Sequence, residues 1–118
     1  MEQDTAKTIM KDNMCLIDYN RAGMPLLEIV TRAVWCSDPE DCKLLVREMQ
    51  EMLSALDISE AKAELGQLRC DVNISVWHPD NKQIRSPRVE IKNVAGAKNV
   101  ERCVEYELRR HALLLESG

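Results

Sequence analysis

The sequence predicts an α+β fold in which an antiparallel β-sheet has one polar, ligand-binding face and helices packed on its apolar face. Residues 68–76 alternate between apolar and polar side chains, which is the period of a half-buried strand. Residues 88–93 repeat the alternation, and the turn-forming residues between the two segments favour an antiparallel pair. Apolar residues at helical spacing follow a helix start at 37–41 and recur after residue 97.

The polar face of this strand pair carries groups that suit recognition. A merely solvated face is usually filled with Lys, Glu, Thr and Gln, whereas this one sets a guanidinium, a carboxylate and an amide two residues apart. A lattice of structural salt bridges would explain the same residues almost as well. The face comprises Arg69, Asp71, Asn73 and Ser75 from the first strand and Arg88, Glu90 and Lys92 from the second.

The segment before the first helix predicts two short strands joined by a loop. Residues 1–14 are polar and lack clear periodicity, residues 15–17 predict a short strand, and residues 26–30 predict a second one. Between them, residues 18–25 contain the glycine and proline of a loop. This loop holds Asp18, Asn20 and Arg21 next to one another, so it is either a solvated loop or the rim of a ligand site.

Two helices are predicted, one before and one after the strand pair. Residues 37–41 combine a capping side chain, an early proline and acids in the first turn, and this helix should end near Asp57 and pack on the sheet. The second helix runs from about Ala97 to Glu116, with three arginines that face either solvent or phosphate. The apolar positions are Leu45, Met49, Met52, Leu53 and Leu56 in the first helix and Val100, Cys103, Val104 and Leu108 in the second.

The composition indicates one domain with a modest core. The 118 residues are 45% hydrophobic and only 3% aromatic, with no Phe, so Leu, Ile, Val and Met must supply most of the buried area. Such a core is thin or shared with other segments. The net charge of −4 excludes neither a local nucleic-acid contact nor an acidic one. No apolar run approaches the ~18 residues of a membrane span, and the first residues lack the layout of a secretory signal.

The five cysteines are odd in number, widely spaced and form no CxxC pair, so the spacing of metal or redox sites is absent. We expect buried, reduced thiols and a reducing compartment.

Several acids and bases form a set suited to holding Mg²⁺ and neutralising phosphate oxygens. The sequence has no Gly-rich phosphate loop, and no nucleophile–base arrangement is evident from spacing. His78 is interpreted as a loop histidine rather than a ligand. The set comprises the carboxylates of Glu2, Asp4, Asp71 and Glu90 and the cations of Arg69, Arg88 and Lys92.

Four sequence motifs, in this order and at these separations, carry a family resemblance. They are EQDTAK at 2–7, DYNRAGMPLLEIV at 18–30, GQLRCDVNIS at 66–75 and EIKN at 90–93. The chain closely resembles the GatB family, one of the subunits of the glutamyl-tRNA(Gln)/aspartyl-tRNA(Asn) amidotransferases. Because GatB proteins are several times longer, residues 1–118 are expected to be an internal part of the catalytic cradle domain, without the N-terminal segment and the C-terminal tRNA-binding helical domains.

The resemblance implies an ATP-dependent carbon–nitrogen ligase that uses glutamine as amido donor. A partner subunit hydrolyses glutamine, and the ammonia reaches the GatB site, where ATP and Mg²⁺ have phosphorylated the side-chain carboxylate of mischarged Glu-tRNA(Gln), or of Asp-tRNA(Asn). Ammonia then displaces the phosphate. The fragment alone is expected to be inactive.

The resemblance also implies roles for individual residues. Glu2 and Asp4 match an acidic motif near the metal and the channel mouth, and they are the expected Mg²⁺ ligands. With Asp71 and Glu90 they form the expected catalytic set. The expected cofactor- and substrate-orienting residues are Asn20, Arg21, Arg69, Asn73, Lys92 and Asn93.

The chain departs from the family pattern at three places. Gln3 stands where many members have a second acid, residues 32–34 replace a common Glu-Pro-Asp, and Ala95-Gly96 replaces an Asn-Ser pair. The first change is expected to weaken metal binding.

The resemblance implies a heterotrimeric complex with amidotransferase subunits A and C, acting on tRNA without a membrane. The Gly66-Gln67 and Trp77-His78-Pro79 variants favour the mitochondrial matrix over the bacterial cytoplasm. Two alternatives stay open, namely a non-catalytic nucleic-acid or subunit-binding module and an inactive gene fragment.

Overall fold

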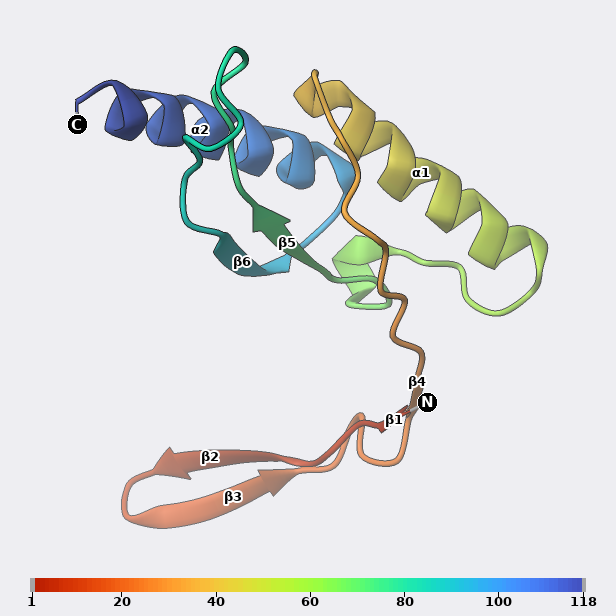
Figure 1. Ribbon diagram of the computed structural model, residues 1–118. Coiled ribbons are helices and arrows are strands. Elements are labelled where there is room, and N and C mark those ends of the chain that lie inside the picture. Colours follow the sequence, from red (N-terminus) through yellow and green to blue (C-terminus); the bar gives the residue numbers. More distant parts are fainter. Residues whose placement is uncertain (1, 118) are drawn as a thin grey trace. The chain divides into compact units, whose positions relative to one another are not determined.

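The computed structural model describes residues 2–117 and divides between Val34 and Trp35 into two compact units (Figure 1). The described residues contain two α-helices and three separate two-stranded antiparallel sheets, so the predicted α+β class is confirmed. The two helices and one of the sheets belong to the second unit. None of the helices in this part of the chain is both long enough and apolar enough to cross a membrane.

The first unit is built on a β-hairpin. Strands β2 (Lys7–Lys11) and β3 (Met14–Asp18) pair in register from Lys7 opposite Asp18 to Lys11 opposite Met14. The two turn residues, Asp12 and Asn13, have φ angles of 48° and 60°. Tight hairpin turns need such left-handed residues, and Asp and Asn tolerate them well. The structure confirms the short strand predicted at 15–17 and adds β2, which the sequence did not predict.

A second, shorter pairing closes the first unit. Strand β1 (Glu2–Gln3) lies antiparallel to β4 (Pro25–Leu26). The strand predicted over residues 26–30 is therefore wrong beyond Leu26, because no other strand within residues 2–117 pairs with this segment. Its apolar residues are typical of a strand, but they stay exposed.

Helix α1 (Pro39–Ala55) begins as the sequence predicted. Asp38 is its N-cap, with a carboxylate that accepts a hydrogen bond of 2.9 Å from the Glu40 N–H, and Pro39 is the first helical residue. Helix α1 packs mainly on helix α2 (Ala97–Glu116), and its Val46 belongs to the core that the two helices share with the sheet, which confirms the expected packing at that residue. Its buried positions are Val46 and Leu53, whereas the predicted Met52 and Leu56 are exposed.

Helix α2 is the centre of the second unit and has the bounds that the sequence predicted. It packs on α1 and on the strand pair formed by β5 (Cys70–Ile74) and β6 (Val89–Val94), as Figure 1 shows. A one-turn 3₁₀ helix, η1 (Ala63–Leu65), precedes β5. The Lys43 ammonium joins the two helices by a 2.7 Å ion pair to Glu101, which raises the pKa of Lys43 above its usual range. The shared core consists of Val46, Ile74, Val94, Ala97, Val100 and Val104.

The β5–β6 pair has the predicted alternation and an irregularity at one end. Val72 lies opposite Ile91, Asn73 opposite Glu90 and Ile74 opposite Val89, and the register shifts between Cys70 and Val72. Alternate side chains along each strand pack toward α2, and the side chains between them are exposed. The predicted sheet is therefore a single strand pair, covered mainly by α2, with Val46 of α1 in the same core.

Candidate functional site

The exposed face of β5–β6 is the first candidate site. Asn73 and Glu90 are direct cross-strand partners, so their side chains share this face. The Lys92 ammonium lies 3.6 Å from the Glu90 carboxylate, and both side chains remain largely exposed. The structure thus places a carboxylate, an amide and an ammonium together on one open surface, as the sequence predicted.

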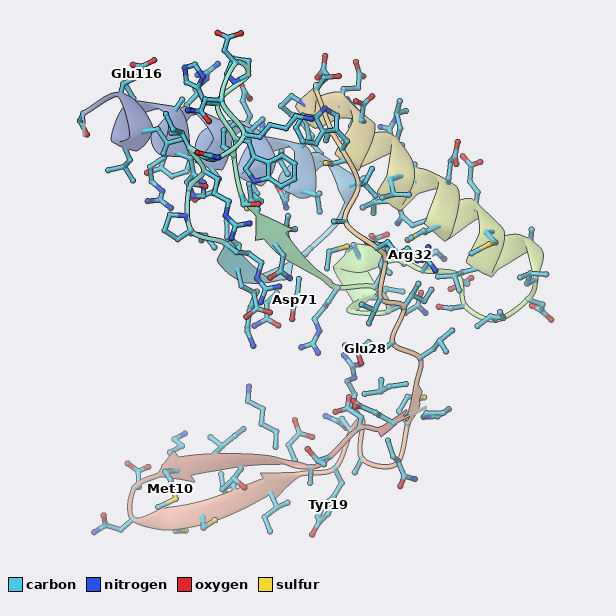
Figure 2. The ribbon with its side chains drawn as sticks, viewed as in Figure 1. Met10, Tyr19, Glu28, Arg32, Asp71 and Glu116 are labelled. Carbon is cyan, nitrogen blue, oxygen red and sulfur yellow. The ribbon has the colours of Figure 1, made fainter. Side chains whose placement is uncertain are left out.

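Asp71 lies beside them, at the register shift. Its Oδ1 accepts a hydrogen bond of 2.9 Å from the backbone N–H of Asn93. Asn93 has a φ of 60°, a left-handed conformation that asparagine adopts more readily than most residues. Figure 2 shows Asp71 on the side of the strand pair turned away from α2. The Asp71 Oδ1 therefore fixes the backbone of β6 at the register shift, while the Asp71 side chain stays exposed at the surface.

Arg69 and Arg88 flank this face at opposite ends. Arg69 immediately precedes β5 and Arg88 immediately precedes β6, and the two strands run antiparallel. Both arginines are exposed. The face therefore has a guanidinium beyond each end rather than two together in the middle, so the predicted convergence is limited to Asp71, Asn73, Glu90 and Lys92.

The second candidate site lies in the first unit, where two motifs that are distant in the sequence meet. The Arg21 Nε lies 3.0 Å from the Asp4 Oδ2, and the Asp4 Oδ1 accepts a 2.9 Å hydrogen bond from the Thr5 N–H. Backbone hydrogen bonds of 2.8 and 2.9 Å join Asp4 to Met24 and Gly23. The predicted loop over 18–25 therefore wraps around the acidic motif.

The remaining predicted residues of this unit are at the surface. Glu2 is exposed in β1, opposite Leu26. Asn20 is exposed, and its backbone N–H donates to the Asp18 carboxylate over 2.9 Å. Within residues 2–117, no group of three or more His, Cys, Asp or Glu side chains is arranged to hold a metal ion.

The sequence prediction missed a buried polar network on α2. The Ser86 Oγ lies 2.7 Å from the Nδ1 of His111, whose Nε2 lies 3.2 Å from the Glu107 carboxylate. Arg110 donates to both oxygens of Glu107, with distances of 2.6 to 3.1 Å. The Ser86 Oγ also accepts a 2.9 Å hydrogen bond from the Val76 N–H. The network therefore ties the connection between β5 and β6 to the helix.

The donors and acceptors of this network can all be satisfied. The Ser86 hydroxyl donates its one proton to the Pro87 carbonyl over 3.1 Å, so the Nδ1–H of His111 donates to the Ser86 Oγ. The His111 Nε2 then accepts from the Arg110 guanidinium 3.1 Å away, which can only donate. The hydrogen bonds from Arg110 hold the pKa of Glu107 below its usual range. Ser86, Glu107 and His111 are buried, so this Ser-His-Glu arrangement supports the fold and is closed to a substrate.

A sequence pattern could have revealed this network. Glu107 and His111 continue the stripe that begins with Val100 and Val104, at the spacing that faces the core. Polar residues at core-facing positions must have partners. Arg110, one of the three arginines of this helix that were expected to face solvent or phosphate, is half-buried and is one of those partners.

The cysteines are free thiols, as predicted, but they are not all buried. Cys15 is exposed, and the other four are half-buried. Cys36 and Cys42 approach with their sulfurs 3.5 Å apart. Burial, and then the neighbouring Cys36, raises the pKa of Cys42 to about 12. Burial also raises the pKa of Cys70 and Cys103. Cys42 is therefore protonated at neutral pH, the unreactive form of a thiol.

Comparison with known proteins gives consistent matches over the chain. The family model of the GatB/GatE catalytic domain matches residues 1–117. The GatB subunit of the aspartyl/glutamyl-tRNA(Asn/Gln) amidotransferase of Streptomyces avermitilis is 42% identical, covering 100% of this chain and 26% of that protein. The corresponding protein of Mesoplasma florum is 45% identical over 98% of this chain and 24% of its own length.

A mitochondrial relative gives a similar match. The GatB subunit of the mitochondrial glutamyl-tRNA(Gln) amidotransferase of Schizosaccharomyces japonicus is 40% identical over 100% of this chain and 24% of its own length. The chain thus spans about a quarter of the length of these relatives. No solved structure matches it. On these grounds, the chain belongs to the GatB/GatE catalytic-domain family.

Proposed function

We propose that this chain is part of the amidotransferase subunit that corrects mischarged tRNA. In this proposal, ATP phosphorylates the side-chain carboxylate of Glu-tRNA(Gln), or of Asp-tRNA(Asn), and ammonia from glutamine displaces the phosphate to give the amide. The relatives named as tRNA amidotransferase subunits support the reaction class. The observation that carries the proposal is the ion-rich β5–β6 face, because two family motifs separated in the sequence place Asn73 directly opposite Glu90.

The exposed face suits the charge requirements of phosphoryl transfer. That reaction needs mainly positioning and stabilisation of charge on the phosphate oxygens. Lys92 on the face, with Arg69 and Arg88 beyond its two ends, supplies cations for those oxygens. Asp71 and Glu90 can orient amine or hydroxyl donors. Other parts of the complex would have to cover this open surface, because an acyl phosphate must be kept from water.

We assign any Mg²⁺ to Glu2 and Asp4. Magnesium in phosphoryl-transfer sites is usually held by one or two carboxylates, with water and phosphate oxygens as the other ligands. Two carboxylates two residues apart in an extended segment provide that donor set, although the structure has no larger cluster in residues 2–117. When bound, the ion would neutralise charge on the phosphate. The ion pair with Arg21 orients the Asp4 carboxylate within the first unit.

The partners and the location are part of the same proposal. We propose amidotransferase subunits A and C as partners, in a heterotrimer that acts on mischarged tRNA. The relatives include bacterial proteins and a mitochondrial one. We propose the mitochondrial matrix, with the bacterial cytoplasm as the alternative.

The test uses the full-length protein in its complete complex. Amide formation on Glu-tRNA(Gln) is measured with ATP at saturating ammonia, which bypasses glutamine hydrolysis. Glu2→Ala, Asp4→Ala and Asp71→Ala should each lower the rate about 100- to 1000-fold, the usual effect of removing one preorganised electrostatic contact. The matched control is Glu105→Ala, which removes an exposed carboxylate of α2 that pairs with Arg109.

Two results would contradict the proposal. Near-normal amide formation in Glu2→Ala and Asp4→Ala would remove these acids from the phosphorylation site. An intact complex that forms no amide at all, with ATP, ammonia and mischarged tRNA present, would favour a binding module or an inactive fragment.

A further inference from the structure

Two tryptophans form an exposed aromatic pair outside the proposed catalytic face. The ring centroids of Trp35 and Trp77 are 5.0 Å apart and the rings are tilted by 45°. Their exposed fractions are 72% and 39%, so both remain accessible to a ligand. They are the only tryptophans of the sequence. Two exposed aromatic rings in contact mark a candidate binding site rather than a core element.

The backbone around Trp77 is fixed, although it belongs to a long connection. Trp77 forms an antiparallel β-bridge with Arg85, and the next N–H, of His78, donates to the Ile84 carbonyl over 2.9 Å. The Ser86 N–H donates to the Val76 carbonyl over 2.8 Å, and the Ser86 side chain is anchored in the buried network. The bridge therefore holds Arg85 directly across from Trp77.

A depression accompanies the aromatic pair. It has a volume of about 420 Å³ and is open to solvent, and Trp77, Lys82, Gln83 and Arg85 line it. Its lining combines an aromatic ring, a side-chain amide and two cations, which are the groups that contact a base and a phosphate.

The local charge differs from that of the whole chain. The segment from Trp77 to Arg88 carries three strong cations and a single acid, Asp80, whereas the whole chain has a net charge of −4. A local cluster of cations beside exposed aromatic rings is the usual composition of a surface for single-stranded nucleic acid. Every base has a π-face that can stack on such a ring, and each phosphate needs a cation.

We propose that this surface binds a single-stranded RNA segment, with a base stacked on Trp77 and neighbouring backbone phosphates at Lys82 and Arg85. The proposal rests on the proposed function, in which the substrate is a tRNA with its reacting amino acid at the end of a strand. Trp35 supports the Trp77 ring from one side. Trp77, Lys82 and Arg85 lie in the connection between β5 and β6 and are not part of the exposed β5–β6 face, so they would hold the RNA while the reaction takes place on that face.

The first test measures binding of a fluorescein-labelled single-stranded RNA octamer to the intact protein by fluorescence anisotropy. Trp77→Ala should weaken binding about 10- to 100-fold, as expected for the loss of one base stack. Trp77→Phe keeps a stacking face and should recover most of the affinity. The matched control is Tyr106→Ala, which removes an exposed aromatic ring from α2 and should leave the affinity unchanged.

The second test measures the salt dependence of the same binding. Lys82→Ala and Arg85→Ala should each reduce the slope of log affinity against log salt by about 0.7, the value for one phosphate contact of a single strand. A merely structural role would not move this slope. Arg109→Ala, which removes an exposed cation of α2, is the control and should leave the slope unchanged.

The outcomes separate this inference from the proposed function. If Trp77→Ala binds the octamer as the unsubstituted protein does, the inference is overturned, whether or not amide formation is intact. The inference would also be overturned if free ATP displaced the octamer and Trp77→Ala abolished ATP binding, because the surface would then be a mononucleotide site. If Trp77→Ala loses RNA affinity while the unsubstituted complex forms no amide, the RNA-binding inference is supported and the proposed reaction is contradicted.

Discussion

The second unit contains two clusters of polar side chains that differ in almost every physical respect. The buried network of Ser86, Glu107, Arg110 and His111 is closed to solvent at three of its four members and has short, mutually satisfied contacts. The β5–β6 face is open, and the ion pair on it, between Glu90 and Lys92, spans 3.6 Å. The polar groups of the buried network bond to one another. The polar side chains of the β5–β6 face are instead exposed, so water or a ligand can bind them.

This difference indicates a structural role for the buried network and a binding role for the exposed face. Buried polar groups destabilise a fold strongly when a partner is lost, so they are suited to fixing a backbone position. Ser86 lies three residues before β6, and its anchoring to α2 sets where that strand begins. Exposed charges contribute little to stability, so they can be selected for binding. The closed network thus positions the open face.

Among substitutions that test this difference, the largest loss of stability is expected at His111. His111→Ala should lower the free energy of unfolding by about 2–4 kcal/mol, because it removes a buried ring and leaves Ser86 and Arg110 without that partner. His111→Gln retains a donor and an acceptor and should lose less. Urea denaturation of the intact protein measures both. A loss below about 0.5 kcal/mol, the range of ordinary surface substitutions, would show that the network does not stabilise the fold.

A smaller effect is expected in the acid dependence of stability. The folded-state pKa of Glu107 is depressed, chiefly by its hydrogen bonds from Arg110. Its contribution is therefore fully present above the pKa of an unfolded glutamate, about 4.3, and is lost as the pH falls through the lower folded pKa. Glu107→Gln should flatten the stability profile in that acidic window while Glu105→Gln, on the exposed side of α2, should not. Thermal melts across the acidic range make the measurement, and parallel profiles for the two variants would contradict the assignment.

Much of this scaffold could be predicted from the sequence, for identifiable reasons. The period-two alternation over 68–76 and 88–93 predicted the correct strand pair, because burial on one face enforces that pattern. The helix start predicted at 37–41, where Asp38 is the cap, and the span of α2 were also correct, since their determinants are local. The segment 26–30 has strand composition, yet it forms a ladder only at Leu26, because pairing depends on a partner strand that local sequence does not reveal.

The candidate sites were predictable in a different way. Alternation alone placed Asp71, Asn73, Glu90 and Lys92 on one face, and the structure confirms that placement. The pairing of Asp4 with Arg21 joins residues with no periodic relation, so each residue was singled out in the sequence but their contact was not predicted. The buried network was missed because only apolar residues of the second helix were assigned to the core stripe, which Glu107 and His111 continue. The chemical roles of all these residues stay predictions.

The smallest expected effect is the coupling between Glu90 and Lys92, and it completes the comparison. A double-mutant cycle with Glu90→Ala and Lys92→Ala should give a coupling energy of about 0–1 kcal/mol in unfolding, because both side chains are exposed and solvent screens the pair. The same cycle with Glu107→Ala and Arg110→Ala should give a larger value, since Glu107 is buried and the contact is bidentate. Urea titrations at low and high salt measure both cycles, and added salt should remove the first coupling more completely than the second. If the Glu90–Lys92 coupling equals or exceeds that of Glu107 and Arg110, the open face is itself a structural lattice. The structural salt-bridge interpretation of its charges would then replace the catalytic one.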